Sequence, residues 1–248
     1  MKKSIRSFLY IILSVYILAG CLTAGKNASA LPLKADRKGF AVLPISDELF
    51  FRMKQGNTYK ENCTVPREDL RYIQALHKDK DGTVHLGEMV VHRIIAEDVL
   101  EILEKLYDAG YPIERMVLAD NYMADDEIMM RDNNSSGFNF RFISHTTKVS
   151  KHGLGMSVDI NTLYNPYHKI VKNADGTQKE VIEPATGKPY LDRTKKFDYK
   201  IEKGDLCYRL FIEKGFEWGG DWSDRKDYQH FELPSSITNV WSEKYQKK

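Results

Sequence analysis

The chain has 248 residues, of which 42% are hydrophobic and 29% are charged, and its formal net charge is +2. The length suits one domain with an extension or two small domains, and the composition is ordinary for a globular protein with a sizeable core. Three basic residues, Lys2, Lys3 and Arg6, lie in a segment that we expect to be removed, which leaves a net charge of about −1. Nothing in this balance indicates a nucleic-acid partner, and we expect none.

Residues 1–20 predict a bacterial lipoprotein signal peptide. They begin with basic residues, and the apolar run 8–18 is shorter than the roughly 20 residues that a membrane-spanning helix needs. The segment Leu18-Ala19-Gly20-Cys21 resembles the bacterial lipobox, whose cysteine is acylated and becomes the new N-terminus. We therefore expect an extracytoplasmic protein that is anchored to the bacterial membrane by lipid on Cys21. The alternative is an ordinary signal cleaved after Ala30, which would give a secreted protein.

If Cys21 carries lipid, Cys63 and Cys207 remain as a pair. Export permits a disulfide between them, whereas the helical pattern around Cys207 is equally compatible with a free thiol in the core. The sequence leaves both alternatives open. Neither cysteine has a Cys-x-x-Cys partner, which argues against a cysteine-rich metal site.

The chain after the signal divides into two predicted parts. Residues 21–60 form a tether and N-terminal extension, because residues 22–45 are mostly polar and small, and residues 61–248 form the folded domain. In chain order, the domain's first half is predicted to contain a helix that starts at Pro66 and continues through Leu76, a turn at 79–82, a strand at 89–92, a helix at 97–109 and a buried strand at 115–119.

The second half of the domain begins with a polar loop at 125–136. The alternating rings of Phe138, Phe140 and Phe142 predict a strand that has Arg141 on its opposite face. Residues 164–200 form a long polar excursion with hairpin turn signals, which suggests a lid or rim, and residues 205–214 predict a helix. Because helices and strands are mixed without strict alternation, we expect an α+β fold with a small antiparallel or mixed sheet flanked by helices.

Two short segments carry the residues of a catalytic metal site. The segment 150–159 contains His152 and Asp159, and the segment 227–232 contains Asp227 and His230. A catalytic zinc site needs three protein ligands, an open position for water and a nearby base. Since glycines interrupt the first segment, we expect His152 to come from a glycine turn and Asp159 from the strand that follows it.

Asp227 is three residues before His230, a spacing that puts the two side chains on one side of a tight turn. A fourth protein ligand would close the metal site to water. We therefore assign Zn²⁺ to His152, Asp159 and His230, and we assign Asp227 as the general base that takes the proton of the attacking water and returns it to the leaving amine.

These residues resemble a known family, the zinc D-alanyl-D-alanine carboxypeptidases. Its relatives include the vancomycin-resistance dipeptidases and the phage-type L-alanyl-D-glutamate endopeptidases. Ser150, His152, Gly155 and Asp159 match the pattern Ser-x-His-x-x-Gly-x-Ala-x-Asp, with Ser157 in place of the usual Ala. Asp227 and His230 match the second pattern, Glu-or-Asp-x-x-His.

Two further features follow from this resemblance. The run Gly-Phe-Glu-Trp-Gly-Gly-Asp-Trp at 215–222 is similar to the endopeptidase branch. The family also has an arginine on a strand before the first zinc ligand, which implies that Arg141 holds a substrate carboxylate or carbonyl oxygen and stabilises the developing oxyanion. The alternative for Arg141 is an ion pair with a surface acid.

The resemblance implies a zinc peptidase that hydrolyses the stem peptides of peptidoglycan, with a fold like that of these peptidases and of the hedgehog signalling domain. We expect a D-Ala-D-Ala carboxypeptidase that acts as a monomer. One alternative is an L-Ala-D-Glu endopeptidase on the same stems. A second alternative is a non-catalytic zinc module that binds the cell wall, against which Asp227 argues because a binding module needs no base.

Overall fold

The computed structural model describes residues 37–143, 146–173 and 175–246. The predicted signal peptide, Cys21 and the first part of the tether lie outside the described residues. Nowhere in the described ranges is there a helix that has both the length and the apolar character needed to cross a membrane.

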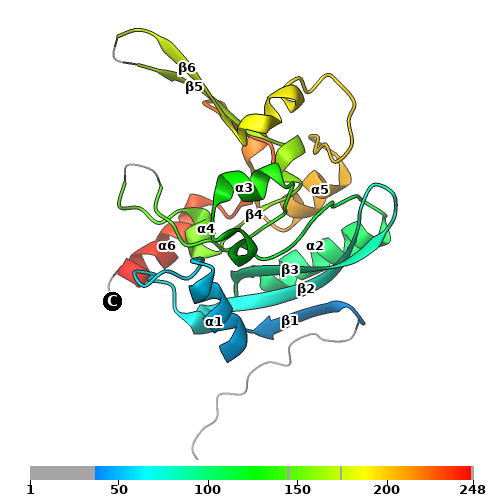
Figure 1. Ribbon diagram of the computed structural model, residues 1–248, viewed down its shortest axis with the longest axis vertical. Coiled ribbons are helices and arrows are strands. Elements are labelled where there is room, and N and C mark those ends of the chain that lie inside the picture. Colours follow the sequence, from blue (N-terminus) through cyan, green and yellow to red (C-terminus); the bar gives the residue numbers. More distant parts are fainter. Residues whose placement is uncertain (1–36, 144–145, 174, 247–248) are drawn as a thin grey trace, which may run out of the picture. The chain divides into compact units, whose positions relative to one another are not determined.

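The first sheet is antiparallel and has the strand order β1-β2-β3, and α2 packs against it (Figure 1). Its elements are β1 (Phe40–Pro44), β2 (Leu70–Lys78), β3 (Val84–His92) and α2 (Ala96–Asp108). The turn between β2 and β3 is the predicted one, and the Asp79 carboxylate accepts hydrogen bonds from the backbone N–H groups of Asp81 and Thr83. The strand β1 lies inside the segment that was expected to be a tether. Strand pairing has therefore already begun at Phe40.

The helix predicted from Pro66 to Leu76 is wrong, because Leu70–Lys78 is strand β2. Only a short 3-10 turn at Arg67–Asp69 follows Pro66. From Ile73 onward, alternate residues of β2 are buried, and these include Ala75 and His77. His77 can be buried because its Nδ1 donates a hydrogen bond of 2.8 Å to the carbonyl of Ile113. The buried face of β2 is therefore continued by a small residue and a polar residue. For this reason the two-residue period of a strand could not be recognised as an alternation of large apolar residues in the sequence.

The two helices predicted at 97–109 and 205–214 are confirmed as α2 and α5 (Leu206–Glu213). The apolar face of α2 is buried against β2, and Gly110 follows its end with a positive φ of +68°. Asp205 caps α5, since its carboxylate accepts a hydrogen bond of 2.7 Å from the backbone N–H of Tyr208. Both helices contribute buried residues to one large hydrophobic core.

Two further small sheets are antiparallel and have the orders β4-β9-β7 and β6-β5-β8. Their strands are β4 (Ser157–Asp159), β5 (Tyr167–Lys172), β6 (Gln178–Glu183), β7 (Glu217–Trp218), β8 (Lys226–Asp227) and β9 (His230–Glu232). The strands β5 and β6 form the hairpin predicted within the excursion, and it projects from the other described elements (Figure 1). Small antiparallel sheets with helices around them make this an α+β fold, as predicted.

The remaining α-helices are α1 (Asp47–Gln55), α3 (Asp126–Arg131), α4 (Lys151–Leu154) and α6 (Ser235–Gln246). The 3-10 turns that follow Arg67–Asp69 are Ala119–Tyr122, Thr162–Tyr164, Ala185–Tyr190 and Gly219–Asp221. The loop predicted at 125–136 is wrong in its first half, because α3 forms there with Asp125 as its N-cap.

The strands predicted around Arg115 and around Arg141 are also wrong. Residue 115 makes one isolated bridge with Asn134, and residue 142 makes one with Val149. The predicted alternation also fails, because Phe138 and Phe140 are buried together with Asn139 between them, whereas Phe142 is exposed. Beyond these isolated bridges, neither segment belongs to a strand in the described part of the chain.

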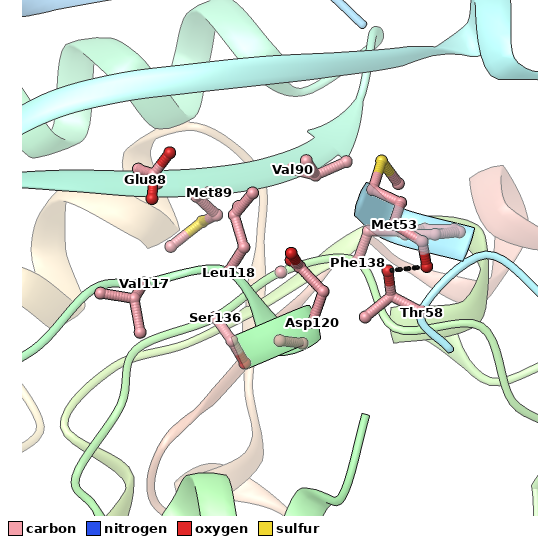
Figure 2. A pocket seen from close by; sticks show the side chains of 12 residues that line it. Met53, Thr58, Glu88, Met89, Val90, Val117, Leu118, Asp120, Ser136 and Phe138 are labelled. Atoms are coloured by element: carbon pink, nitrogen blue, oxygen red, sulfur yellow. Dashed lines mark hydrogen bonds between the residues drawn. The ribbon is translucent and has the colours of Figure 1, made fainter. Parts of the chain in front are cut away.

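A small pocket lies between α1, β3 and the 3-10 turn at Ala119–Tyr122 (Figure 2). Thr58 donates a hydrogen bond to the Met53 carbonyl, and Arg52 forms an ion pair with the buried carboxylate of Asp120 at one wall. These contacts fasten α1 to the rest of the fold. Cys63 and Cys207 are free thiols, and only Cys207 is fully buried.

Candidate metal centre

The side chains of His152, Asp159 and His230 converge on one buried point. One nitrogen or oxygen atom from each of them lies within 4.8 Å of the others. His230 Nδ1 is 2.8 Å from Asp159 Oδ1, and His152 Nε2 is 3.1 Å from His230 Nδ1 and 3.2 Å from Asp159 Oδ2. The antiparallel pairing of β4 with β9 sets Asp159 directly opposite His230, which explains how residues 71 positions apart meet.

His152 reaches this point from the single-turn helix α4. Ser150 caps the helix, and its hydroxyl accepts a hydrogen bond of 2.9 Å from the backbone N–H of Gly153. Gly155 ends the helix with a φ of +69°, and its carbonyl accepts a hydrogen bond of 2.7 Å from the backbone N–H of His92. A Cβ at position 155 would come within 2.8 Å of the His92 nitrogen, so both the backbone angle and the close approach require glycine.

Each histidine has a second partner that fixes its tautomer. The carbonyl of Gly137 can only accept, so His152 Nδ1 donates to it at 2.7 Å and leaves Nε2 for the cluster. The carboxylate of Glu232 accepts from His230 Nε2 at 3.0 Å, which leaves Nδ1 for the cluster. This arrangement fits a metal site, because metal-bound histidines almost always donate their other N–H to a carbonyl or carboxylate.

The charges around the cluster favour a cation. Burial lowers the pKa of His230, but hydrogen bonds with Asp159 and Glu232 outweigh burial and raise this pKa to about 10. Burial raises the pKa of Asp159, but the two histidines outweigh it and hold this pKa well below its ordinary value. The field of the two carboxylates therefore stabilises a positive charge, whether a proton or a metal ion, at the centre of the cluster.

Asp227 lies on β8 in the same cleft as the three clustered residues. Its Oδ1 atom is buried and has no hydrogen-bond partner among the described residues. Burial raises the pKa of Asp227 to about 7, His230 opposes this rise, and the negative charge of Asp159 adds to it. Gly219 packs against this residue, since a Cβ at 219 would lie 2.5 Å from the Asp227 carbonyl oxygen.

Arg141 also lines the cleft, outside any strand. Its Nε donates to Asp126 Oδ2 at 2.9 Å, and Asn139 Nδ2 donates to the other oxygen of Asp126 at 2.8 Å. Arg141 therefore lines the cleft and also forms the ion pair with an acid that was the alternative expectation. The pair fixes the guanidinium at the cleft wall.

The cleft has a volume of about 490 Å³. Its other walls include Tyr167 from β5, Glu183 from β6, and Trp222 and Arg225 from the segment before β8. The indole of Trp222 lies against the His230 ring, with 5.6 Å between ring centroids. Trp218 is buried in the core and stacks on Phe231.

Sequence reasoning missed Glu232 as the partner of His230. The two residues are two positions apart on β9, so the period of a strand puts them on the same face and could have revealed the pair. It also missed the Gly137 carbonyl, for which the sequence contains no signal. Cys21, the predicted site of lipid attachment, lies outside the described residues.

Comparison with known protein families finds a match in the second half of the chain. Residues 144–233 match the family model described as D-alanyl-D-alanine carboxypeptidase. No curated protein and no solved structure matches the chain. The matched segment contains all three clustered residues and Asp227, whereas Arg141 lies just before it.

Proposed function

We propose that the chain is a zinc-dependent hydrolase of the D-alanyl-D-alanine carboxypeptidase type, which cleaves the stem peptides of peptidoglycan. The resemblance seen in the two motifs is confirmed by the family match over residues 144–233, and it supports a metallopeptidase. The observation that carries the proposal is the convergence of His152, Asp159 and His230 beside a buried carboxylate in one cleft.

The clustered atoms fit zinc, since two imidazoles and one carboxylate are a common catalytic set for this ion. Bound there, zinc would supply Lewis acidity to a scissile carbonyl and would acidify water. Glu232 and the Gly137 carbonyl hold the two imidazoles in the required tautomers. The chain therefore provides the ligands together with the groups that orient them.

Asp227 is the general base in this proposal. Its buried Oδ1, which has no hydrogen-bond partner in the described part of the chain, is able to accept the proton of an attacking water and then to deliver it to the leaving amine nitrogen. Burial raises the pKa of Asp227 above its ordinary value, which makes this carboxylate a stronger base than an exposed aspartate.

Arg141 would stabilise the oxygen of the scissile carbonyl as negative charge develops on it. Its Nε is committed to Asp126, so the ends of the guanidinium fork are the groups that would face a substrate. In this proposal the enzyme works outside the cytoplasm, anchored through lipid on Cys21.

The bond could also be L-Ala-D-Glu within the same stems. The observation in favour is that Trp222, the last residue of the endopeptidase-like run at 215–222, forms part of the cleft wall beside His230. A non-catalytic zinc module is disfavoured by the burial of the unpartnered Asp227 oxygen beside the cluster.

The test is the variant Asp227→Asn, which keeps the shape of the side chain and removes its basicity. We expect zinc content equal to that of the wild type and hydrolysis of muropeptides reduced about 10²- to 10⁴-fold. The matched control is Asp198→Asn, an exposed residue that does not line the cleft and that should hydrolyse normally.

Mass spectrometry of the digested muropeptides identifies the bond, because release of D-Ala and cleavage after L-Ala give products of different mass. Full activity of Asp227→Asn with zinc bound would refute the base assignment. Zinc bound without turnover of any stem peptide by the wild type would favour the binding module.

A further inference from the structure

The cleft contains a second guanidinium, that of Arg225, which the proposed chemistry does not use. Arg225 lies in the short segment between the 3-10 turn Gly219–Asp221 and β8, two residues before Asp227. Its guanidinium carbon is 4.2 Å from the centroid of the Trp222 ring. Because that ring in turn contacts His230, one aromatic layer separates Arg225 from the metal-ligand cluster.

The two arginines of the cleft differ in their surroundings. Arg141 is paired with Asp126, which Asn139 holds in place. Glu183 lines the same cleft, and burial together with the charges of Glu127 and Asp126 raises its pKa, so carboxylates crowd this wall. An anionic substrate group approaching Arg141 would meet these like charges, which suits Arg141 to a carbonyl oxygen rather than to a full carboxylate.

Arg225 is available for an anion. Among the described residues its ion-pair partner is the neighbouring Asp224, at 2.6 Å, and the Asp224 side chain is 60% exposed. Exposed pairs of this kind contribute little, so a ligand carboxylate can replace Asp224 at low cost. The Trp222 ring holds the guanidinium plane in position, which reduces the freedom that is lost when a ligand binds.

We propose that Arg225 binds the α-carboxylate of the residue that supplies the leaving amine, and that it thereby selects substrates with a free carboxylate immediately after the cleaved bond. This inference rests on the proposed function, because it requires a peptide in the cleft. Both candidate bonds satisfy it. The last D-Ala of a stem has a free carboxylate, and the D-Glu of a stem has one because the chain continues through its side-chain carboxyl group.

The arrangement also sets the direction in which a peptide lies. Register across β6, β5 and β8 places Glu183, Tyr167 and Asp227 in one row, with Glu183 at the end away from β8. Arg225 immediately precedes β8. Arg225 therefore offers a substrate carboxylate a positive charge next to Asp227, whereas the other end of the row is the acidic side chain of Glu183.

The test compares two pairs of synthetic stem peptides, one pair for each candidate bond. The members of a pair differ only after that bond, where one has a free α-carboxylate and the other a carboxamide. Hydrolysis and equilibrium binding by calorimetry are measured for the zinc-loaded wild type and for Arg225→Gln, Arg225→Lys, Arg141→Gln and the control Arg209→Gln. Arg209 is an exposed residue of α5 outside the cleft.

For the bond that is cleaved, we expect the wild type to prefer the acid over the amide. Arg225→Gln should lower kcat/KM for the acid about 10- to 100-fold and leave the amide nearly unchanged, because a charge-assisted hydrogen bond is lost only with the acid. For the acid, kcat/KM of Arg225→Lys should fall between the values of the wild type and of Arg225→Gln. Arg209→Gln should match the wild type.

Equal losses for acid and amide in Arg225→Gln would overturn the inference, since they indicate a structural role. Loss of the preference in Arg141→Gln alone, or no preference in the wild type, would also overturn it. If the wild type cleaves no peptide but binds an acid better than its amide in a manner that depends on Arg225, the peptidase proposal fails and the Arg225 assignment stands.

Discussion

The hydrogen bond between His230 and Glu232 leads to a quantitative prediction about metal binding. Glu232→Gln keeps an oxygen that accepts from His230 Nε2 but removes the negative charge, and Glu232→Ala leaves that N–H without a partner. The His230 and Glu232 side chains are only 8% and 13% exposed, so water replaces the lost carboxylate poorly. The pKa of Glu232 is lowered, because His230 outweighs the effect of burial, which indicates that the carboxylate is charged.

The size of the effect follows from this geometry. Loss of a partner that orients a metal-bound histidine typically weakens metal binding about 10- to 100-fold. We expect Glu232→Gln near the lower end of that range, since the donor stays paired, and Glu232→Ala near the upper end, since a buried N–H is left without an acceptor.

The assay is the zinc dissociation constant, measured by competition with a chromophoric chelator at one fixed pH. Glu217→Gln is the matched control, because Glu217 is exposed and pairs with Glu232 across β7 and β9. Wild-type zinc affinity in Glu232→Ala would refute the reasoning, since Glu232 would then have no part in orienting the ligand.

Two further predictions concern stability. Gly155→Ala should lower the free energy of unfolding by more than the ~1–2 kcal/mol expected for a left-handed residue alone, because the new Cβ also meets the His92 nitrogen at 2.8 Å. Gly82→Ala is the control, because Gly82 has a similar φ of +80° but no atom within 4 Å of the new Cβ. If urea denaturation gave the same loss of unfolding free energy for both variants, the close approach at Gly155 would have no effect. Burial lowers the pKa of His92 to about 4, so the fold keeps it neutral while the unfolded chain takes up a proton near pH 6.5. The contribution of neutral His92 to the free energy of unfolding is complete above pH 6.5. It declines by up to about 3 kcal/mol as the pH falls toward 4. Urea midpoints at pH 7.5 and 4.5 test this, and an equally large decline in His92→Asn would count against it.

The metal-ligand set could be proposed from sequence because ligand chemistry is local. The predicted strand at Asp159 is β4, whereas the predicted glycine turn at His152 is wrong, because His152 lies on the single-turn helix α4 that Gly155 ends. Helices α2 and α5 were also predicted, since each has a regular apolar face and a stop signal at its end.

Elements whose burial depends on remote partners were not predictable. The strand β2 was predicted as a helix because its buried face continues through a polar residue, His77. The Ile113 carbonyl, which is distant in sequence, accepts the hydrogen bond that allows His77 to be buried. The helix α3 was predicted as a loop because the segment 125–136 is mostly polar, although the N-cap of the helix and its buried Met129 stabilise it. The helix α6 was not predicted, and its buried Tyr245 donates to Asp69 from the other end of the domain.

The sequence by itself determined which groups can bind a metal, because the chemistry of imidazole and carboxylate belongs to the side chains and their spacing. Only the tertiary structure decided that Glu232 orients His230, that Arg225 stacks on Trp222, and that burial brings the pKa of Asp227 to about 7. These properties depend on which atoms become neighbours and how much water they lose, and strand pairing across the fold sets both.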